Sequence, residues 1–434
     1  MAKTQGHPGK VLVLGAGIAG LGAARALRAA GVDVAVIEAR DRIGGRTYTS
    51  SLWSDLPADM GAAWVHGTKG NPLTVLADKT GVALTKTSYK RSMAIDQAGQ
   101  RVDLLPMVKQ AQSIVQAARA GVEDLENDVS LRQAVESHPH WQALSSDARH
   151  GLRLAINSRI EHEYSGDWDR LSAWHYDDGK DFPGPEAILT PGYGPIVGHL
   201  ARGLDLRLSE PVTDIAPKGA GVQITTTRGT HRADRAVVTV PLGVLQSGSI
   251  RFAEPLKRKR QRAIDSLGMG LLNKCVLRFD RAFWPNGTDW IHFLGSVQTL
   301  WADWTSYLTA TGQPLLVGFN AAAMAEEIEL LDDRATTASA MEALRAMFGT
   351  SIPAPLGSQI SRWRQDPYAQ GSYSFQSVGT SWRDRKALFG TDWGGRLIFA
   401  GEATSQDHAA TVHGALMTGR RAAKLILHGS SSVA

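Results

Sequence analysis

The sequence predicts an α/β fold that opens with a strand–helix–strand unit, and three neighbouring segments support this. The apolar run KVLVL at 10–14 leads directly into GAGIAG at 15–20. A helical stretch follows and closes at Gly31, and VDVAVIEAR then forms a second strand that ends at Glu38. A short apolar, β-branched run, then glycines, then a helix is the order of a parallel βαβ unit.

The glycines of this unit have the spacing G-x-G-x-x-G. Gly15 permits the tight turn, Gly17 lets a pyrophosphate approach the backbone, and Gly20 lets helix and strand pack closely. The helix N-terminus attracts phosphate, and Glu38, 23 residues after Gly15, suits a ribose with an unphosphorylated 2′-hydroxyl. The sequence therefore predicts a Rossmann-type dinucleotide-binding domain.

Composition excludes several other classes. A chain of 434 residues with 43% hydrophobic and 21% charged residues is long enough for two or three lobes and is not disordered or a coiled coil. A single cysteine, Cys275, excludes an intramolecular disulfide. We expect a cytoplasmic protein, because the start MAKTQGHPGK lacks an apolar signal region and no stretch approaches the ~18 apolar residues of a membrane span. MAKTQGHPG and GSSSVA are expected to be tails.

Further motifs follow in a recognisable order. These are ARDRIGGRT at 39–47, DMGAAWVHGTKGNP at 59–72, VPLGVL at 240–245, LLNKCVLRF at 271–279, RWRQDPYAQGSYSF at 362–375 and IFAGEATSQDHAATVHGALMTGRRAA at 398–423. With these segments the chain resembles the flavin-dependent amine oxidases over nearly its whole length. GSYS and ATVHGAL place it nearest the polyamine oxidase and lysine-specific demethylase branch.

The resemblance implies FAD as cofactor and a discontinuous, GR2-like FAD-binding domain at 8–75, 196–262 and 386–431. An α+β substrate-binding domain is expected at 76–195 and 263–385. The segment at 210–240 alternates as a meander of strands would. The expected cofactor-binding residues are Gly15, Gly17, Ile18, Ala19, Gly20, Glu38, Ala39, Arg40, Gly44, Gly45, Arg46, Gly61, Ala62, Ala63, Trp64, Val212, Pro241, Trp363, Gly401, Glu402, Thr411 and Val412.

Two features of the C-terminal block concern the flavin. The segment TVHGALMTGRRAAKLIL from Thr411 has helical spacing with basic residues in its later turns. In the family this helix start faces the flavin edge that gains negative charge on reduction, and Glu402 would hold the ribityl chain. Where monoamine oxidases carry the cysteine that tethers the flavin, this chain has Ser372, so we expect non-covalent FAD.

Lys274 is the principal catalytic candidate. Strand alternation places it on one face with Leu272 and Val276, so its ammonium is expected among apolar neighbours, and burial would lower its pKa. A lone strand lysine more often reaches solvent, but the LNK match favours the family role, binding a water beside flavin N5.

Three further residues complete the catalytic set. Tyr373 resembles the aromatic wall that orients the amine, and Trp363 resembles the tryptophan packed against the flavin; both are alternatively core residues. His66 could orient a substrate nitrogen or accept a proton, or be structural. The opposite wall, aromatic in monoamine oxidases, is Thr411, which makes small arylamines poor candidates.

The charge of the chain points to a cationic substrate. The net charge is +5, but 161–186 holds eight carboxylates against two basic residues, a local balance of −6. Glu161 and Glu163 are therefore expected to bind substrate, although a solvated acidic loop is an alternative. The opposite run, KRKRQR at 257–262, is interpreted as a solvated helix face, with no nucleic-acid partner.

The resemblance implies oxidation of a secondary or polyamine-like amine to an imine by hydride transfer to flavin N5. Hydrolysis would give a carbonyl, and O2 would reoxidise the flavin to yield hydrogen peroxide. An L-amino-acid oxidase or a biosynthetic tailoring oxidase of a bulky amine or amide is the alternative, and a non-catalytic chromatin-binding protein is a poorer one. We expect a monomer or homodimer with no metal and no membrane association.

Overall fold

The computed structural model describes residues 9–428, so the predicted tails, residue 8 and residues 429–431 of the predicted FAD-binding domain lie outside the described residues. The predicted opening unit is confirmed as β1 (Val11–Leu14), α1 (Ile18–Ala29) and β2 (Val34–Ile37). The two strands pair in parallel. Every residue of both strands is buried, as expected for a parallel sheet covered on both faces.

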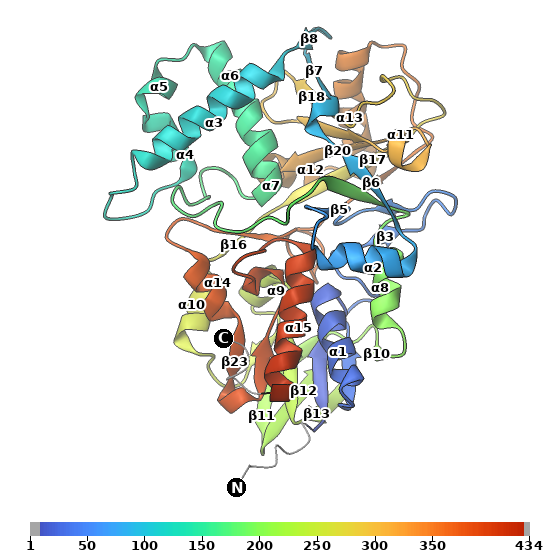
Figure 1. Ribbon diagram of the computed structural model, residues 1–434, viewed down its shortest axis with the longest axis vertical. Helices are drawn as coiled ribbons and strands as arrows, with labels where there is room; N and C mark the ends of the chain where they lie inside the picture. Colours follow the sequence, from blue (N-terminus) through green and yellow to red (C-terminus); the bar gives the residue numbers. More distant parts are fainter. Residues whose placement is uncertain (1–8, 429–434) are drawn as a thin grey trace.

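The opening unit belongs to a six-stranded sheet in the order β10-β2-β1-β14-β24-β23. The added strands are β10 (Asp205–Arg207), β14 (Arg235–Val238), β24 (Leu397–Phe399) and β23 (Gly390–Asp392). Only β23 among them pairs antiparallel. α1 packs against α15 (Val412–His428) and α8 (Gly194–Ala201), and this layer forms the lower half of Figure 1.

The other face of this sheet carries the predicted meander. It is a four-stranded sheet, β13-β12-β11-β15, made of β11 (Val212–Lys218), β12 (Gly221–Thr226), β13 (Gly229–Ala233) and β15 (Arg251–Phe252). The helices α9 (Leu242–Gln246), α10 (Arg258–Ser266) and α14 (Trp382–Leu388) lie beside it. The interpretation of 257–262 as a solvated face is wrong for Arg260. This side chain is 2% exposed and donates to the carbonyls of Leu388 and Phe389, because its position on α10 faces α14.

A seven-stranded sheet dominates the upper half of the molecule (Figure 1). Its order is β21-β17-β20-β19-β18-β7-β8, with β7 (Ser92–Asp96), β8 (Arg101–Val102), β17 (Leu272–Arg278), β18 (Trp290–Leu294), β19 (Asp303–Ser306), β20 (Leu315–Ala321) and β21 (Gly357–Ile360). One face packs an apolar core with α13 (Asp333–Phe348). α11 (Leu308–Thr311) and α12 (Ala322–Glu329) flank β20.

A helical lobe lies beside this sheet. It contains α3 (Leu104–Ala120), α4 (Leu131–Ser137), α5 (Pro139–Gln142), α6 (Ser146–Ile156), a π-helical turn Asn157–Glu161 and α7 (His162–Tyr164). Its core includes Trp141, Trp168 and Phe375. Small sheets connect the halves: β5 (Trp64–Val65), β9 (Glu186–Thr190) and β6 (Ala83–Thr87); β3 (Thr49–Ser50) and β4 (Ala58–Asp59); β16 (Gly268–Met269) and β22 (Ser374–Phe375).

The predicted α/β class is confirmed, whereas the division into two domains stays a prediction. All strands of the six-stranded sheet lie inside the predicted FAD-binding segments, and all strands of the seven-stranded sheet lie inside the predicted substrate-binding segments. Four predicted boundaries fall inside helices: α2 (Pro72–Thr80), α8, α10 and α14. These helices pack on elements of the predicted FAD-binding segments. α2 and α8 belong to the core around α1, and α10 and α14 pack against each other.

Candidate active site

One cavity of about 1250 Å³ extends between the two large sheets. Glu38 and Val212 line one part of it, and Lys274, Tyr373 and Trp363 line another. Its volume exceeds the upper end of the roughly 300–1,000 Å³ usual for a small-ligand site. The cavity can therefore hold a dinucleotide together with a second molecule.

The structure brings nearly all predicted site residues to this cavity. Gly20 and Glu161 are the exceptions. A Cβ on Gly20 would lie 1.9 Å from the Gly15 carbonyl oxygen. Gly20 thus serves close packing between α1 and β1, the role that the spacing predicts, but it is not a cavity-lining residue.

The N-terminus of α1 fits a phosphate-bearing ligand. Gly15 has a φ of +106° and so makes a turn that other residues rarely adopt. Gly17, the N-cap of α1, lines the cavity, and no side chain caps this helix and no acidic residue stands in its first turn. The first N–H groups of the helix therefore remain for an anion, where the helix dipole also favours negative charge.

A second glycine turn supports the first. Gly44 donates its backbone N–H to the Ala16 carbonyl at 2.9 Å, and it forms a β-bridge with Gly17. Gly44 and Gly45 have φ values of +96° and +59°. Both turns line the cavity, so two backbone segments without side chains border the phosphate position.

Glu38 occupies the position expected of a ribose ligand. It follows β2 directly, is 4% exposed and lines the cavity. Its Oε2 accepts the Ala16 N–H at 2.7 Å, and its Oε1 accepts the Arg40 N–H at 2.9 Å. Each carboxylate oxygen retains a lone pair, so Glu38 is fixed in orientation and can still accept hydroxyl donors.

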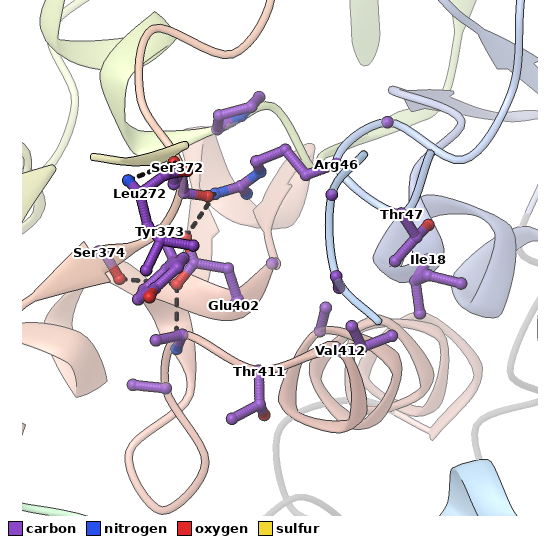
Figure 2. Close-up of a pocket in the computed structure, with 18 of the residues that line it drawn as sticks. Ile18, Arg46, Thr47, Leu272, Ser372, Tyr373, Ser374, Glu402, Thr411 and Val412 are labelled. Atoms are coloured by element: carbon purple, nitrogen blue, oxygen red, sulfur yellow. Dashed lines mark hydrogen bonds and ion pairs between the residues drawn. The ribbon is translucent and has the colours of Figure 1, made fainter. Parts of the chain in front are cut away.

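Arg46 and Glu402 form an ion pair in the central part of the cavity (Figure 2). The Arg46 Nη1 lies 2.9 Å from Glu402 Oε1 and also donates to the Ser372 carbonyl. Glu402 Oε2 accepts Ser374 Oγ at 2.7 Å and the Ala410 N–H at 3.1 Å. Burial alone would raise the pKa of Glu402, but the charges of Arg46 and Arg385 and these hydrogen bonds lower it. Glu402 therefore holds Arg46 and the 405–411 loop in place.

The start of α15 faces the same part of the cavity. Figure 2 shows Thr411 and Val412 across from Ile18. Thr411 Oγ1 accepts the Gly414 N–H at 3.0 Å and donates to the His408 carbonyl at 2.9 Å. Thr411 is thus an N-capping residue as well as a cavity wall, and the predicted second helix N-terminus at the cofactor region is present.

Lys274 lies buried in the floor of the cavity. It is 4% exposed, and its neighbours on the same strand face, Leu272 and Val276, pack in one apolar cluster as the alternation predicts. Its Nζ donates to the carbonyls of Asp59 at 2.8 Å and Gly61 at 2.5 Å. Burial lowers the pKa of Lys274 to about 8, against the opposing charge of Asp59. The ammonium has three donors, so one remains for a further acceptor.

Aromatic side chains form two walls near Lys274. Tyr373 lines the cavity, and its hydroxyl donates to the His162 carbonyl at 2.6 Å. Burial raises the pKa of Tyr373, so its ring, not a phenolate, faces the cavity. Trp363 is 6% exposed, donates Nε1 to the Met60 carbonyl at 3.3 Å, and packs over Gly61, whose added Cβ would lie 3.2 Å from the ring.

A row of stacked rings extends away from Lys274. The Lys274 Nζ lies 5.7 Å from the Trp64 ring centre. Trp64 stacks on Trp290 at 5.6 Å, and Trp290 stacks on Tyr89 at 4.8 Å. The Arg159 guanidinium covers the Tyr89 ring at 3.6 Å. Apolar faces of this kind suit a methylene chain and its cations.

His66 lies at an acidic side of the cavity. Its Nδ1 is 2.7 Å from Glu186 Oε2, and its side chain is 43% exposed. Burial opposes protonation, but the hydrogen bond to Glu186 and the charges of Glu163, Glu186 and Asp181 raise the pKa of His66 to about 9. The contact with Glu186 and the neighbouring carboxylates thus favour the protonated form of His66, and its role in catalysis stays a prediction.

The acidic stretch separates into two groups. Glu163, Asp177, Asp178, Asp181 and Glu186 line the cavity. The expectation that Glu161 binds substrate is wrong. Glu161 is 1% exposed and bonds Arg153, Asn157 and the Trp168 N–H. Its side chain points into the helical lobe because neighbouring helix positions face different sides.

One group in the cavity matches no motif in the sequence. His162 Nδ1 lies 3.0 Å from Asp303 Oδ2, and His292 Nδ1 lies 2.6 Å from Asp303 Oδ1. His162 and Asp303 line the cavity. His162 on α7 lies more than 100 positions before His292 on β18 and Asp303 on β19. Only strand register and helix placement therefore bring the three residues together.

The comparisons with known proteins agree with this site. Residues 18–427 match the family described as flavin containing amine oxidoreductase. The chain belongs to this family: it is a flavin-containing amine oxidase, and its cofactor is FAD.

Among its relatives, polyamine oxidase 4 of Oryza sativa subsp. japonica is 36% identical, over 96% of this chain and 88% of that protein. Lysine-specific histone demethylase 2 of Homo sapiens is 32% identical, but the match covers 53% of that protein and 97% of this chain. A solved putrescine oxidase variant with redesigned cofactor binding has the same fold, with a TM-score of 0.78, 20% identity, and coverage of 96% of this chain and 99% of that one. Within residues 9–428, no helix combines the length and apolarity needed to cross a membrane.

Proposed function

We propose that this enzyme oxidises the C–N bond of a secondary or polyamine-like amine to an imine, which hydrolyses to a carbonyl compound and a shorter amine. The observation that carries this proposal is Glu163. Its carboxylate lines the cavity, and it has no hydrogen bond or ion pair within residues 9–428. Glu163 is exposed at the cavity, and its charge acts on His66 without a direct contact, so its carboxylate can pair with an ammonium group.

FAD, when bound, supplies the two-electron acceptor that takes a hydride equivalent from the carbon beside the amine and passes the electrons to O2. Gly17, Gly44, Gly45 and Glu38 would hold its nucleotide half, and α15 would face its flavin. The substrate nitrogen must be neutral to release hydride, because an ammonium has no lone pair.

Lys274 would hold or accept a proton beside the reacting amine. Its pKa of about 8 means that both its charged and its neutral form are populated slightly above neutral pH. The free donor of its Nζ can hold a water molecule for imine hydrolysis, and the neutral amine can accept a proton from it. Tyr373 and Trp363 present ring faces that orient the uncharged amine.

We propose that FAD binds without a covalent tether. Ser372, at the position of the tethering cysteine, has its Oγ engaged with the backbone N–H and carbonyl of Leu272. Cys275 is the single cysteine. It is fully buried in the core on the sheet face opposite Lys274, where burial raises its pKa to about 12.

One observation favours an acidic substrate such as an amino acid. Arg159 lines the cavity and has no carboxylate partner within the described chain. However, Trp64, Trp290 and Tyr89 lie between Arg159 and Lys274. An α-carboxylate adjacent to the reacting amine would not reach Arg159, so this geometry disfavours an L-α-amino acid.

The test is peroxide release from the purified, FAD-loaded enzyme with spermine, spermidine, N-acetylated polyamines, monoamines and L-amino acids. Turnover of polyamines in preference to monoamines supports the proposal. Turnover of amino acids alone would replace it with the amino-acid oxidase alternative. Release of the flavin into the supernatant after acid precipitation tests the absence of a covalent tether.

A further inference from the structure

The buried group His162–Asp303–His292 is built on one row of the seven-stranded sheet. The register pairs His292 with Asp303, Asp303 with Phe319, and Phe319 with Lys274 on successive strands. Residues directly opposite one another in a sheet point to the same face. Asp303 therefore lies on the face that carries Lys274, two strands away, or about 10 Å at the usual strand spacing.

His162 reaches this row from the helical lobe. It follows the π-helical turn Asn157–Glu161, a type of helix irregularity that is common at functional sites. Within residues 157–164, the cavity is lined by Ser158, Arg159, His162, Glu163 and Tyr164. The contact of His162 with Asp303 joins this end of the lobe to the seven-stranded sheet.

The ionisation of Asp303 fixes both imidazoles. Burial would raise the pKa of Asp303, but the charges and hydrogen bonds of His292 and His162 hold it well below its usual range. A carboxylate only accepts hydrogen bonds, so each ring presents Nδ1–H to it. The Nε2 atoms of both rings are buried without a partner within residues 9–428. Asp303 is therefore the one polar contact that orients either ring.

The backbone of His162 also holds the Tyr373 side chain in place. The Tyr373 hydroxyl donates to the His162 carbonyl at 2.6 Å, and Ser165 Oγ donates to the Tyr373 carbonyl at 3.1 Å. Both ends of Tyr373 thus rest on the turn 162–165, where Ser165 has a φ of +55°. The position of the Tyr373 ring depends on the position of this turn.

We propose that His162, Asp303 and His292 form a positioning element that sets the Tyr373 ring against the reacting amine. Asp303 clamps His162, the His162 carbonyl holds the Tyr373 hydroxyl, and His292 keeps Asp303 in register. These are positioning residues, since they act through Tyr373. The inference rests on the proposed function in one respect only: Tyr373 faces the substrate amine.

The test uses Asp303→Asn, which keeps the size of the side chain but presents an amide donor to one of the Nδ1–H groups. We expect kcat/KM for the best amine of the panel to fall about ten- to hundredfold, since small misplacements of an orienting group have effects of this size. The dissociation constant of tert-butylamine is the second readout. This amine lacks an α-hydrogen, so it cannot be oxidised, and its binding is followed by the flavin absorbance.

Three further variants and one matched control make the result specific. In a double-mutant cycle with Tyr373→Phe, which removes only the hydroxyl, the effects of the two substitutions should be strongly non-additive. His162→Ala should resemble Asp303→Asn, whereas His162→Asn, whose amide N can replace Nδ1, should restore much of the wild-type value. The matched control is Asp392→Asn. Asp392 is a buried carboxylate paired with Arg260 outside the cavity, so its loss lowers the Tm but not kcat/KM.

Additive effects of Asp303→Asn and Tyr373→Phe, or equal activity of His162→Ala and His162→Asn, would overturn the proposal. If Asp303→Asn fails to fold, the two His162 variants decide alone. Binding of tert-butylamine is measured without turnover. A wild-type enzyme that oxidises none of the amines would therefore reject the proposed function, and the effect of the variants on tert-butylamine binding would still test the positioning element.

Discussion

Replacing Lys274 with methionine separates the chemistry of this residue from its contribution to stability. Methionine is similar in length and apolar, so it keeps the packing with Leu272 and Val276 and removes the ammonium. Lys274 is 4% exposed, and its pKa falls from 10.5 to about 8. At 1.36 kcal/mol per pKa unit, burial of the charged form costs roughly 3 kcal/mol at neutral pH.

The variant also loses two hydrogen bonds, from Nζ to the carbonyls of Asp59 and Gly61. Each contributes about 1–1.5 kcal/mol, so the loss nearly cancels the gain. The free energy of unfolding should change by less than about 1–2 kcal/mol at pH 7, and FAD should stay bound. Turnover should fall about 10²–10⁴-fold, the usual contribution of a proton-transferring group.

The pH dependence of the folding stability gives a second, independent test of the lowered pKa of Lys274. Between pH 8 and 10.5 the unfolded chain binds a proton at Lys274 that the folded chain does not. The stability of the wild type should therefore rise with pH in this window relative to Lys274→Met. Thermal unfolding at pH 7 and pH 10, FAD content, and peroxide release at saturating substrate measure these quantities. Unchanged turnover with FAD bound would refute the role of Lys274.

Three other substitutions test the assignments of Glu163, Gly20 and Glu161. Glu163→Gln should raise KM for a triamine about two- to fivefold, the range of a solvent-accessible ion pair, and change KM for a monoamine less; steady-state kinetics measure this. Gly20→Ala places a Cβ 1.9 Å from the Gly15 carbonyl oxygen, so we expect destabilisation of at least about 3 kcal/mol and purified protein with little flavin per chain. Glu161→Gln leaves Arg153 without its buried counter-ion and should destabilise the fold by about 3–5 kcal/mol, seen as a lower Tm with an unchanged KM.

Matched controls exist for two of these variants. Gly198 lies in a helix with open space where a Cβ would be added, so Gly198→Ala should fold and bind FAD normally. Asp169, an exposed carboxylate of the same acidic stretch, does not line the cavity, and Asp169→Asn should leave the triamine KM unchanged. An equal rise in KM for both acidic variants would mean that Glu163 acts only through the overall charge of the stretch.

Local patterns were enough to predict the opening βαβ unit, the meander and the helix after Thr411. Each depends on residues close in sequence: apolar runs, glycines at turns, and helical spacing. The same locality explains why the strand alternation around Lys274 predicted its apolar neighbours. The roles of the predicted site residues in catalysis stay predictions.

Other features depend on which helix face meets which strand. Glu161 and Glu163 are two positions apart, yet one bonds within the helical lobe and the other lines the cavity, because residues two positions apart in a helix point to opposite sides. Arg260 is buried in a run of basic residues for the same reason, since its place on α10 faces α14. Charge composition alone does not distinguish such positions.

The sequence by itself determined the dinucleotide-binding start, the family and the buried lysine, because these follow from short-range spacing and matched motifs. Only the tertiary structure decided which carboxylates line the cavity, and only it brought His162, His292 and Asp303 together. Their contact is set by the register of β18 and β19 and by the approach of α7 to that sheet. Such long-range packing has no periodic signal in one sequence.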